Sequence, residues 1–86
     1  MPIYGSSNIV PMDIRKIVGA NVRAFRENRG LTLAELGKKA NIHGQYLGGV
    51  ERGTRNPTLT NLHRIAKALE VPEYILFMED AKSWLK

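Results

Sequence analysis

Residues 32 to 53 constrain the fold of this chain more than any other stretch. Thr32 and Glu35 have the spacing of a capping box, in which each side chain bonds the other residue's free backbone N–H at the start of a helix. Helical spacing of apolar residues then predicts one helix over 33–40 and a second over 44–51. The connection between them is so short that the two helices must meet at a corner.

The second of these helices has an unusual surface. Leu47 and Val50 lie on one face, and the opposite face carries Gly44, Gln45, Gly48, Gly49 and Arg52. Relative to alanine, three glycines inside a helix cost about 2.5–3 kcal/mol. A face so poor for stability indicates a surface that presses against another molecule.

Composition limits what the chain can be. Its 86 residues make one domain, and because it has no cysteine, neither a disulfide nor a thiolate metal site is possible. The longest apolar run, 74–78, is too short to cross a membrane, and the first basic residue, Arg15, lies too late for a signal peptide. We therefore expect a soluble cytoplasmic protein with no membrane partner.

Charge is distributed unevenly along the chain. Residues 13–67 hold eleven Lys and Arg against four Asp and Glu, whereas residues 70–86 hold four acidic residues against two lysines. The net charge of +5 is therefore +7 in the body and −2 in the tail. A positive body attracts polyanions, although a solvated basic surface would have the same composition.

The first part of the chain predicts an arm followed by a helix. Residues 1–12 contain Pro, Gly and Ser without periodicity and are expected to form a flexible N-terminal arm. Asp13 can cap a first helix, which Gly30 ends. Its apolar stripe is Ile14, Ile17, Val18, Val22 and Phe25.

Two more helices follow the turn-rich loop 53–57. Thr58 can cap a fourth helix, and Pro72 and Glu73 favour the start of a fifth. The fourth helix has the apolar stripe Leu59, Leu62, Ile65, Ala66 and Leu69. The sequence thus predicts an all-α, compact five-helix domain over 13–77, with a C-terminal extension over 78–86.

No arrangement of residues suggests catalysis or a cofactor. His43 and His63 are the two histidines, and without cysteine their separation matches no zinc site. Gly37 and Lys38 resemble the end of a phosphate-binding loop, but the other positions of that motif do not match. We expect no enzyme, no metal, no cofactor and no small-molecule ligand.

Five motifs together carry a family resemblance. They are Arg-x-x-Arg at 23–26, Arg-Gly-Leu-Thr at 29–32, Glu-Leu at 35–36, Val-Glu-Arg-Gly-x-Arg-Asn-Pro-Thr-Leu at 50–59 and Ile-Ala-Lys-Ala-Leu-Glu-Val at 65–71. From about Ile17 to Phe77 the chain resembles the phage-repressor-like (Xre/Cro type) helix-turn-helix family. The resemblance implies a lambda-repressor-like domain that binds operator DNA, usually as a two-fold dimer.

The resemblance implies that the third helix enters the major groove and reads bases with Gln45, Tyr46, Gly44 and Gly49. A glutamine can bond adenine N6 and N7 together. Tyr46 has two open interpretations: contact with a base edge or the sugar-phosphate, or simple packing.

A second implied set contacts phosphates and sets the register without reading sequence. It consists of Thr32, His43, Arg52, Arg55 and Asn56. His43 stands where the family often has a helix cap, so it either caps the third helix or meets a phosphate. For Arg52 and Arg55 the alternative is ordinary solvated charge.

Arg26 and Glu51 match the family's internal ion pair, which would join the first helix to the end of the third. The role implied for them is structural.

The glycines depart from the family pattern, which commonly has Arg, Gln, Ser or Glu at positions 44, 48 and 49. Either the bare face lets the helix sit deeper in the groove, with recognition by Gln45, Tyr46 and DNA deformability, or base reading has weakened.

The tail combines apolar and acidic residues. Leu76 and Phe77 are candidates for the core. The candidates for a homodimer interface are Tyr74, Ile75, Met78 and Trp84.

Two functions remain open at this point. The leading one is a sequence-specific regulator of transcription, most simply a repressor, similar to small stand-alone family members such as restriction-modification controller proteins. The alternative is an antitoxin-like protein-interaction module of the same fold, with weak or non-specific DNA binding.

Overall fold

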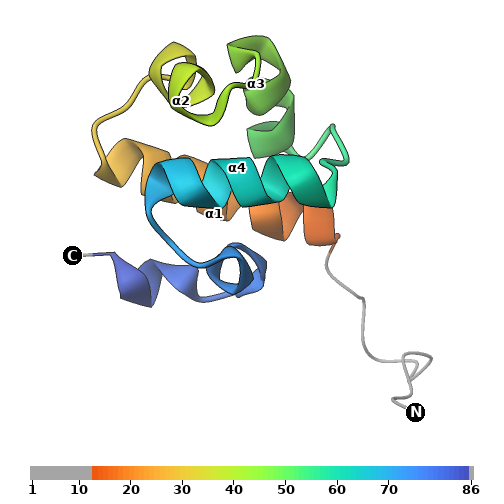
Figure 1. Cartoon of the computed structure of the whole chain (residues 1–86). Coiled ribbons are helices and arrows are strands. Elements are labelled where there is room, and N and C mark those ends of the chain that lie inside the picture. The colour runs from red at the N-terminus through yellow and green to blue at the C-terminus, as the bar shows by residue number, and fades with distance from the viewer. Residues whose placement is uncertain (1–12, 86) are drawn as a thin grey trace.

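The computed structural model describes residues 13–85, where all the regular secondary structure is helical and no strand occurs. Its α-helices are α1 (Ile14–Asn28), α2 (Leu33–Ala40), α3 (Gly44–Arg52) and α4 (Leu59–Leu69), and two short 3₁₀ helices follow, η1 (Glu73–Phe77) and η2 (Ala81–Trp84). In Figure 1, α1 and α4 lie between the α2–α3 pair and the η1–η2 segment. The all-α prediction is confirmed, with four α-helices; the expected arm, 1–12, lies outside the described residues.

Side chains and left-handed residues define the helix ends as the sequence predicts. Asp13 caps α1 by accepting from the Arg15 backbone N–H at 3.0 Å, and the Thr58 side chain accepts from the Asn61 backbone at the start of α4. Gly30, just after α1, has a φ of 68°, a conformation that costs glycine little. These local signals are strong because each satisfies backbone groups that a helix end leaves unpaired.

A single hydrophobic core joins the four α-helices to the C-terminal segment. It is built from side chains of α1 to α4 together with η1 and Ala81, and its largest fully buried members include Phe25, Leu36, Leu47, Ile65 and Leu69. The first turns of α1 and α4 extend beyond this core. Ile14 is therefore 49% exposed and Leu59 is 81% exposed, so the expectation that both belong to buried stripes is wrong.

The backbones of α1 and α3 come into direct contact. A Cβ atom built on Gly19 would lie 2.2 Å from the Val50 carbonyl oxygen and 2.7 Å from that of Glu51. Only a residue without a side chain fits at this crossing. The position of α3 is thus set by backbone approach to α1.

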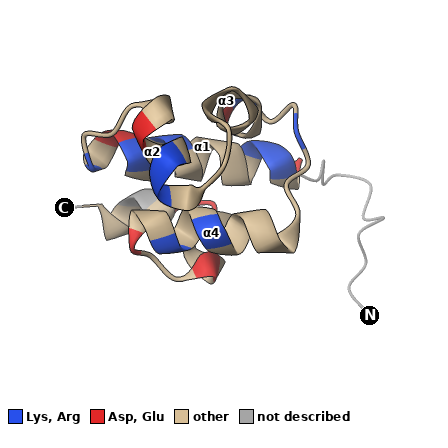
Figure 2. Cartoon of the chain, turned by 45° about the horizontal axis from the view of Figure 1, so that its top comes forward, with Lys and Arg blue, Asp and Glu red and all other residues tan. Residues whose placement is uncertain are grey.

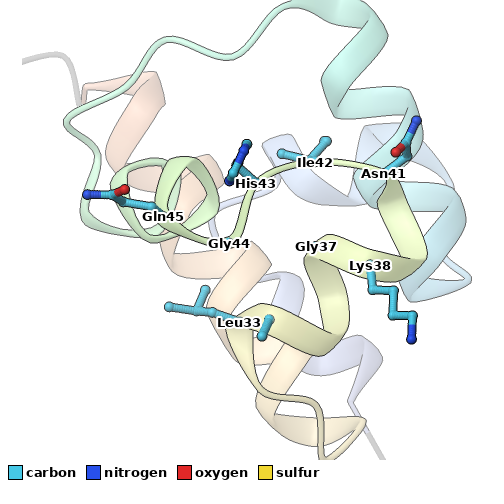
Figure 3. A pocket seen from close by; sticks show the side chains of 9 residues that line it. Leu33, Gly37, Lys38, Asn41, Ile42, His43, Gly44 and Gln45 are labelled. Atoms are coloured by element: carbon cyan, nitrogen blue, oxygen red, sulfur yellow. The ribbon is translucent and has the colours of Figure 1, made fainter.

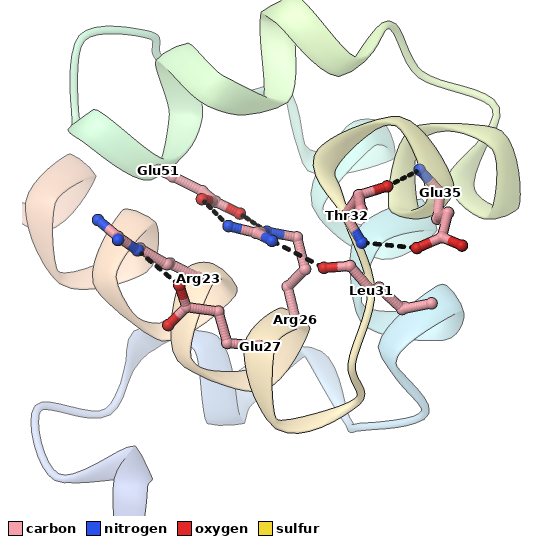
Figure 4. Close-up of polar contacts among 7 residues, drawn as sticks. All are labelled: Arg23, Arg26, Glu27, Leu31, Thr32, Glu35 and Glu51. Carbon is pink, nitrogen blue, oxygen red and sulfur yellow. Dashed lines mark hydrogen bonds and ion pairs between the residues drawn. The ribbon is translucent and has the colours of Figure 1, made fainter.

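An ion pair also joins α1 to α3, near the end of α3 (Figure 4). Arg26 donates through Nε and Nη2 to the two carboxylate oxygens of Glu51, at 2.6 and 3.0 Å, and its Nη1 donates to the Leu31 carbonyl at 2.7 Å. The side chains are 13% and 6% exposed. The hydrogen bonds to Glu51 raise the pKa of Arg26, so its guanidinium is charged, and the pair implied by the sequence is present.

The C-terminal segment folds differently from the expected fifth α-helix. The segment Glu73–Phe77, which follows Pro72, is a short 3₁₀ helix, in which the Ile75 N–H bonds the Pro72 carbonyl and the Met78 N–H bonds the Ile75 carbonyl, each three residues back. The tighter winding changes which side chains face inward. Leu76 is buried as expected, but Ile75 is also fully buried and Phe77 is 40% exposed. Ile75 therefore belongs to the core and not to a dimer interface, and Phe77 does not belong to the core.

Asn21, a buried polar residue of α1, holds this segment in place. Its amide donates to the carbonyls of Leu76 and Met78, both at 2.8 Å. Because Ala81 is also fully buried, the chain after Phe77 packs on the same core as the helices.

The α1–α3 crossing predicts that Gly19→Ala destabilises the fold. The added methyl group meets backbone carbonyls that cannot move without shifting a helix. The free energy of unfolding, measured in urea, should therefore fall by about 1–3 kcal/mol. Gly44→Ala is the matched control, since its Cβ would be 3.4 Å from the nearest atom. Equal stability of the two variants would contradict the crossing.

The ion pair predicts a second contrast. Glu51→Ala leaves the partly buried Arg26 without its partner and should cost about 3–5 kcal/mol of unfolding free energy. Glu27→Ala removes the exposed partner of Arg23 (3.2 Å, 64% and 55% exposed). That change should cost no more than about 0.5 kcal/mol, and similar losses in both variants would refute the buried clamp.

Candidate nucleic-acid interface

The corner between α2 and α3 needs a glycine and a left-handed residue. Asn41 ends α2 with a φ of 58°, and the Ile42 N–H bonds the Gly37 carbonyl at 2.8 Å. A Cβ on Gly37 would lie 2.4 Å from the Ile42 carbonyl oxygen. The two helices are therefore held in a fixed helix-turn-helix unit (Figure 3).

An open hollow runs between the two helices on the surface of this unit (Figure 3). It is lined by Leu33, Ala34, Gly37, Lys38, Asn41, Ile42, His43, Gly44 and Gln45. The Gln45 side chain is exposed and points away from α2, so its amide is free to meet an external group. Lys38 adds a positive charge that the sequence analysis did not assign to the site.

His43 stands at the start of α3 but makes no cap hydrogen bond with its side chain. The expectation that it caps the helix is wrong, because the exposed imidazole does not reach the backbone N–H groups of the first turn. Its other expected role, contact with a phosphate, stays a prediction.

Thr32 is exposed at the start of α2, but its capping groups are already used (Figure 4). Its hydroxyl accepts from the Glu35 N–H at 3.1 Å, and its own N–H donates to the Glu35 carboxylate at 2.8 Å. This backbone bond lowers the pKa of Glu35, so the carboxylate is charged at neutral pH. The helix N-terminus thus has an internal anion, and any contact between Thr32 and a phosphate remains a prediction.

The glycines of α3 are not bare in the structure. Gly48 and Gly49 are both buried, Gly48 beneath the guanidinium of Arg52 and Gly49 beneath the stem of Arg55. The expected face of exposed backbone is therefore wrong: side chains from the end of α3 and the following loop fold back over it. Gly49 consequently cannot present its own backbone to a base, whereas Gly44 is half-buried at the edge of the hollow.

Cationic side chains surround this face. Arg52, Arg55 and Asn56 are exposed as expected, and within the described chain neither arginine forms a salt bridge with a carboxylate. Arg23 and Arg52 line a second hollow, which is separate from the one described above. Lys16 lies against Gly53, where a Cβ would be 2.8 Å from the lysine Cγ.

Lys16 and Arg23 both belong to α1. The sequence did not predict them at this site because neither is near α3 along the chain. Figure 2 shows basic residues on α1, on α2 and on the loop that follows α3.

Tyr46 lies half-buried at the edge of this surface. Its hydroxyl accepts from the Asn61 amide of α4 at 3.4 Å, and its ring packs against the core. The Arg55 guanidinium carbon stands 5.8 Å from the ring centroid. These contacts favour the packing interpretation of Tyr46, with its ring supporting an arginine.

The opposite end of the molecule has a different character. Tyr74 and Trp84 are 60% and 46% exposed and contact each other edge-to-face, with ring centroids 6.4 Å apart. Met78 is partly buried against the core. Beside them, His63 bonds Glu73 at 2.7 Å, and this bond lowers the pKa of the carboxyl.

Residues 13–85 contain no helix with the length and apolar character of a membrane span. Within the same residues, no group of three or more His, Asp or Glu side chains is arranged to hold a metal ion.

Known proteins of similar sequence support the helix-turn-helix arrangement seen in the structure. The helix-turn-helix family profile matches residues 22–76. An uncharacterised helix-turn-helix transcriptional regulator of Sinorhizobium fredii is 45% identical over 60 residues, covering 70% of this chain and 78% of the relative. Control protein C.SmaI of Serratia marcescens is 41% identical over 63 residues, covering 73% and 75%.

A solved structure agrees with these relatives. The restriction-modification controller protein C.AhdI of Aeromonas hydrophila superposes with a TM-score of 0.71 at 35% identity, over 73% of this chain and 96% of that one. Both the sequence and the three-dimensional arrangement of the helix-turn-helix unit are therefore shared. The chain belongs to the phage-repressor-like (Xre type) helix-turn-helix family of DNA-binding regulators.

Proposed function

We propose that this protein is a sequence-specific regulator of transcription that binds double-stranded DNA through α3 and the loop after it. The observation that carries the proposal is the pair of unpaired cations Arg52 and Arg55, at the end of α3 and in the loop after it, together with the exposed amide of Gln45 in the first turn of the same helix. Arginines bind the phosphate backbone and set the register, while an amide discriminates between base edges. We also place this protein in the cytoplasm, as the sequence predicts.

A homodimer and repression are the further parts of the proposal. A two-fold dimer presents two recognition helices to half-sites about 34 Å apart, one turn of DNA. The exposed aromatic pair Tyr74 and Trp84, with Met78 beside it, supports a contact at the end opposite α3. The similarity to restriction-modification controller proteins and to the immunity repressor of Bacillus phage phi105 favours a small regulator that occludes a promoter.

DNA binding should respond differently to the two kinds of residue. Arg52→Ala should weaken binding to all sequences and lower the slope of log K against log salt by about one, because one phosphate contact is lost. Gln45→Ala should cost about 1–3 kcal/mol at one base pair of a selected site and relax the preference there. Both are measured by fluorescence anisotropy, after selection of bound sequences from random DNA.

Arg64→Ala is the control for charge, since this exposed arginine lines a separate hollow with Lys39 and Lys67. It should leave the salt slope unchanged. If the wild-type protein selects no motif, and if Arg52→Ala and Gln45→Ala both bind DNA like the wild type, the antitoxin-like interaction module becomes the better account.

The dimer contact predicts that Trp84→Ala shifts the protein towards a monomer. Sedimentation at micromolar concentration should give about twice the 9.7 kDa chain mass for the wild type. Leu59→Ala, which truncates an exposed apolar residue on α4, should leave the dimer intact. Dissociation by Leu59→Ala but not by Trp84→Ala would move the interface to the start of α4.

A further inference from the structure

Arg55 lies in a loop but is placed by two contacts with α3, one with Gly49 and one with the Tyr46 ring. Its stem fills the space above Gly49, where a Cβ atom would lie 2.6 Å from the arginine Cγ and 3.5 Å from Nε. Its guanidinium then stands over the Tyr46 ring, 5.8 Å from the centroid. That ring is held from below by the core and at its hydroxyl by Asn61.

The neighbouring residue keeps the loop against the helix. Thr54 donates twice to the Gly49 carbonyl oxygen, through its backbone N–H at 2.9 Å and its hydroxyl at 3.1 Å. Arg55 therefore leaves the helix end from a fixed point. From that point its stem crosses α3 at the position where residue 49 would carry a side chain.

Restricting an arginine before it binds has a physical benefit. A free arginine side chain loses rotamer freedom when it meets a phosphate, and a guanidinium already stacked on an aromatic ring has lost part of that freedom in advance. In the described chain no carboxylate lies within salt-bridge distance of Arg55, so its charge remains available to an anion.

We propose that Gly49 is a positioning residue for DNA binding: its missing side chain leaves the space through which Arg55 reaches the Tyr46 ring, and from there the guanidinium contacts a DNA phosphate. The inference rests on the proposed function. It assigns to Gly49 an action through Arg55 in place of direct base reading, and it gives Tyr46 a supporting role.

Gly48 offers a matched control one residue away. A Cβ there would approach only the tip of Arg52, whose Nη1 lies 3.1 Å away and can move easily. Both substitutions to alanine raise helix propensity, but Gly49→Ala must also displace the arginine stem, so the Tm of each variant is measured beside its DNA affinity. If the glycines had a purely structural role, DNA affinity would follow the stability of each variant and would not depend on Arg55.

The test is a double-mutant cycle on the full chain, with a random-sequence DNA duplex as the probe and fluorescence anisotropy as the readout. Gly49→Ala should weaken binding roughly tenfold, the value of one charge-assisted hydrogen bond, and should lower the salt slope by about one. Gly48→Ala should bind like the wild type. In an Arg55→Ala background, Gly49→Ala should cause no further loss.

Tyr46→Leu gives a second route to the same answer if Gly49→Ala does not fold. It removes the ring face but keeps an apolar side chain, and it should weaken binding only when Arg55 is present. The inference is wrong if wild-type protein binds the duplex and Gly49→Ala binds equally well, or if either loss persists without Arg55. A wild-type protein that does not bind DNA at all would overturn the proposed function itself, and this inference with it.

Discussion

The contact of the α1 and α3 backbones at Gly19 is the constraint on which the rest of this structure depends. No side chain separates the two helices there, so small movements of α3 relative to α1 would produce overlap of atoms on one side or a gap on the other. The Arg26–Glu51 ion pair also joins these two helices, near the end of α3. The short, glycine-rich α3 is therefore fixed at two points to α1, the longest helix of the fold.

The α2–α3 side of the molecule and the end formed by η1 and η2 differ in charge. Figure 1 places α2 and α3 on the opposite side of the molecule from η1 and η2. The α2–α3 side carries the unpaired Lys38, Arg52 and Arg55, and the end formed by η1 and η2 carries the exposed rings of Tyr74 and Trp84 with Glu73 near them. A DNA duplex repels the acidic end and attracts the basic side. A partner protein bound at the aromatic end would therefore not compete with DNA for the same surface.

Much of the fold could be predicted because its signals are local. Asp13, Thr32 and Thr58 cap the helices that the sequence predicts, since a cap needs only the next three residues. The errors come from longer range. Spacing places Leu59 on the buried face of its helix, but it cannot tell that the core ends before the first turn of α4.

The same limit applies to the site. A helical wheel shows Gly48 and Gly49 as bare because it omits side chains that return from outside the helix, such as that of Arg55. The approach of Lys16 to Gly53 joins segments far apart in sequence and has no signal in either one. Base-reading and phosphate roles for individual residues stay predictions.

The side of the molecule that we propose to face the DNA is the α2–α3 side, with Gln45, Arg52 and Arg55. The most direct measurement is a map of backbone amide NMR shifts as a selected DNA duplex is added to the full chain. The largest shifts should fall on residues 43–56 and at the start of α2, with little change in α4 after its first turn. Shifts confined to η1 and η2, or to the outer face of α4, would contradict the claim.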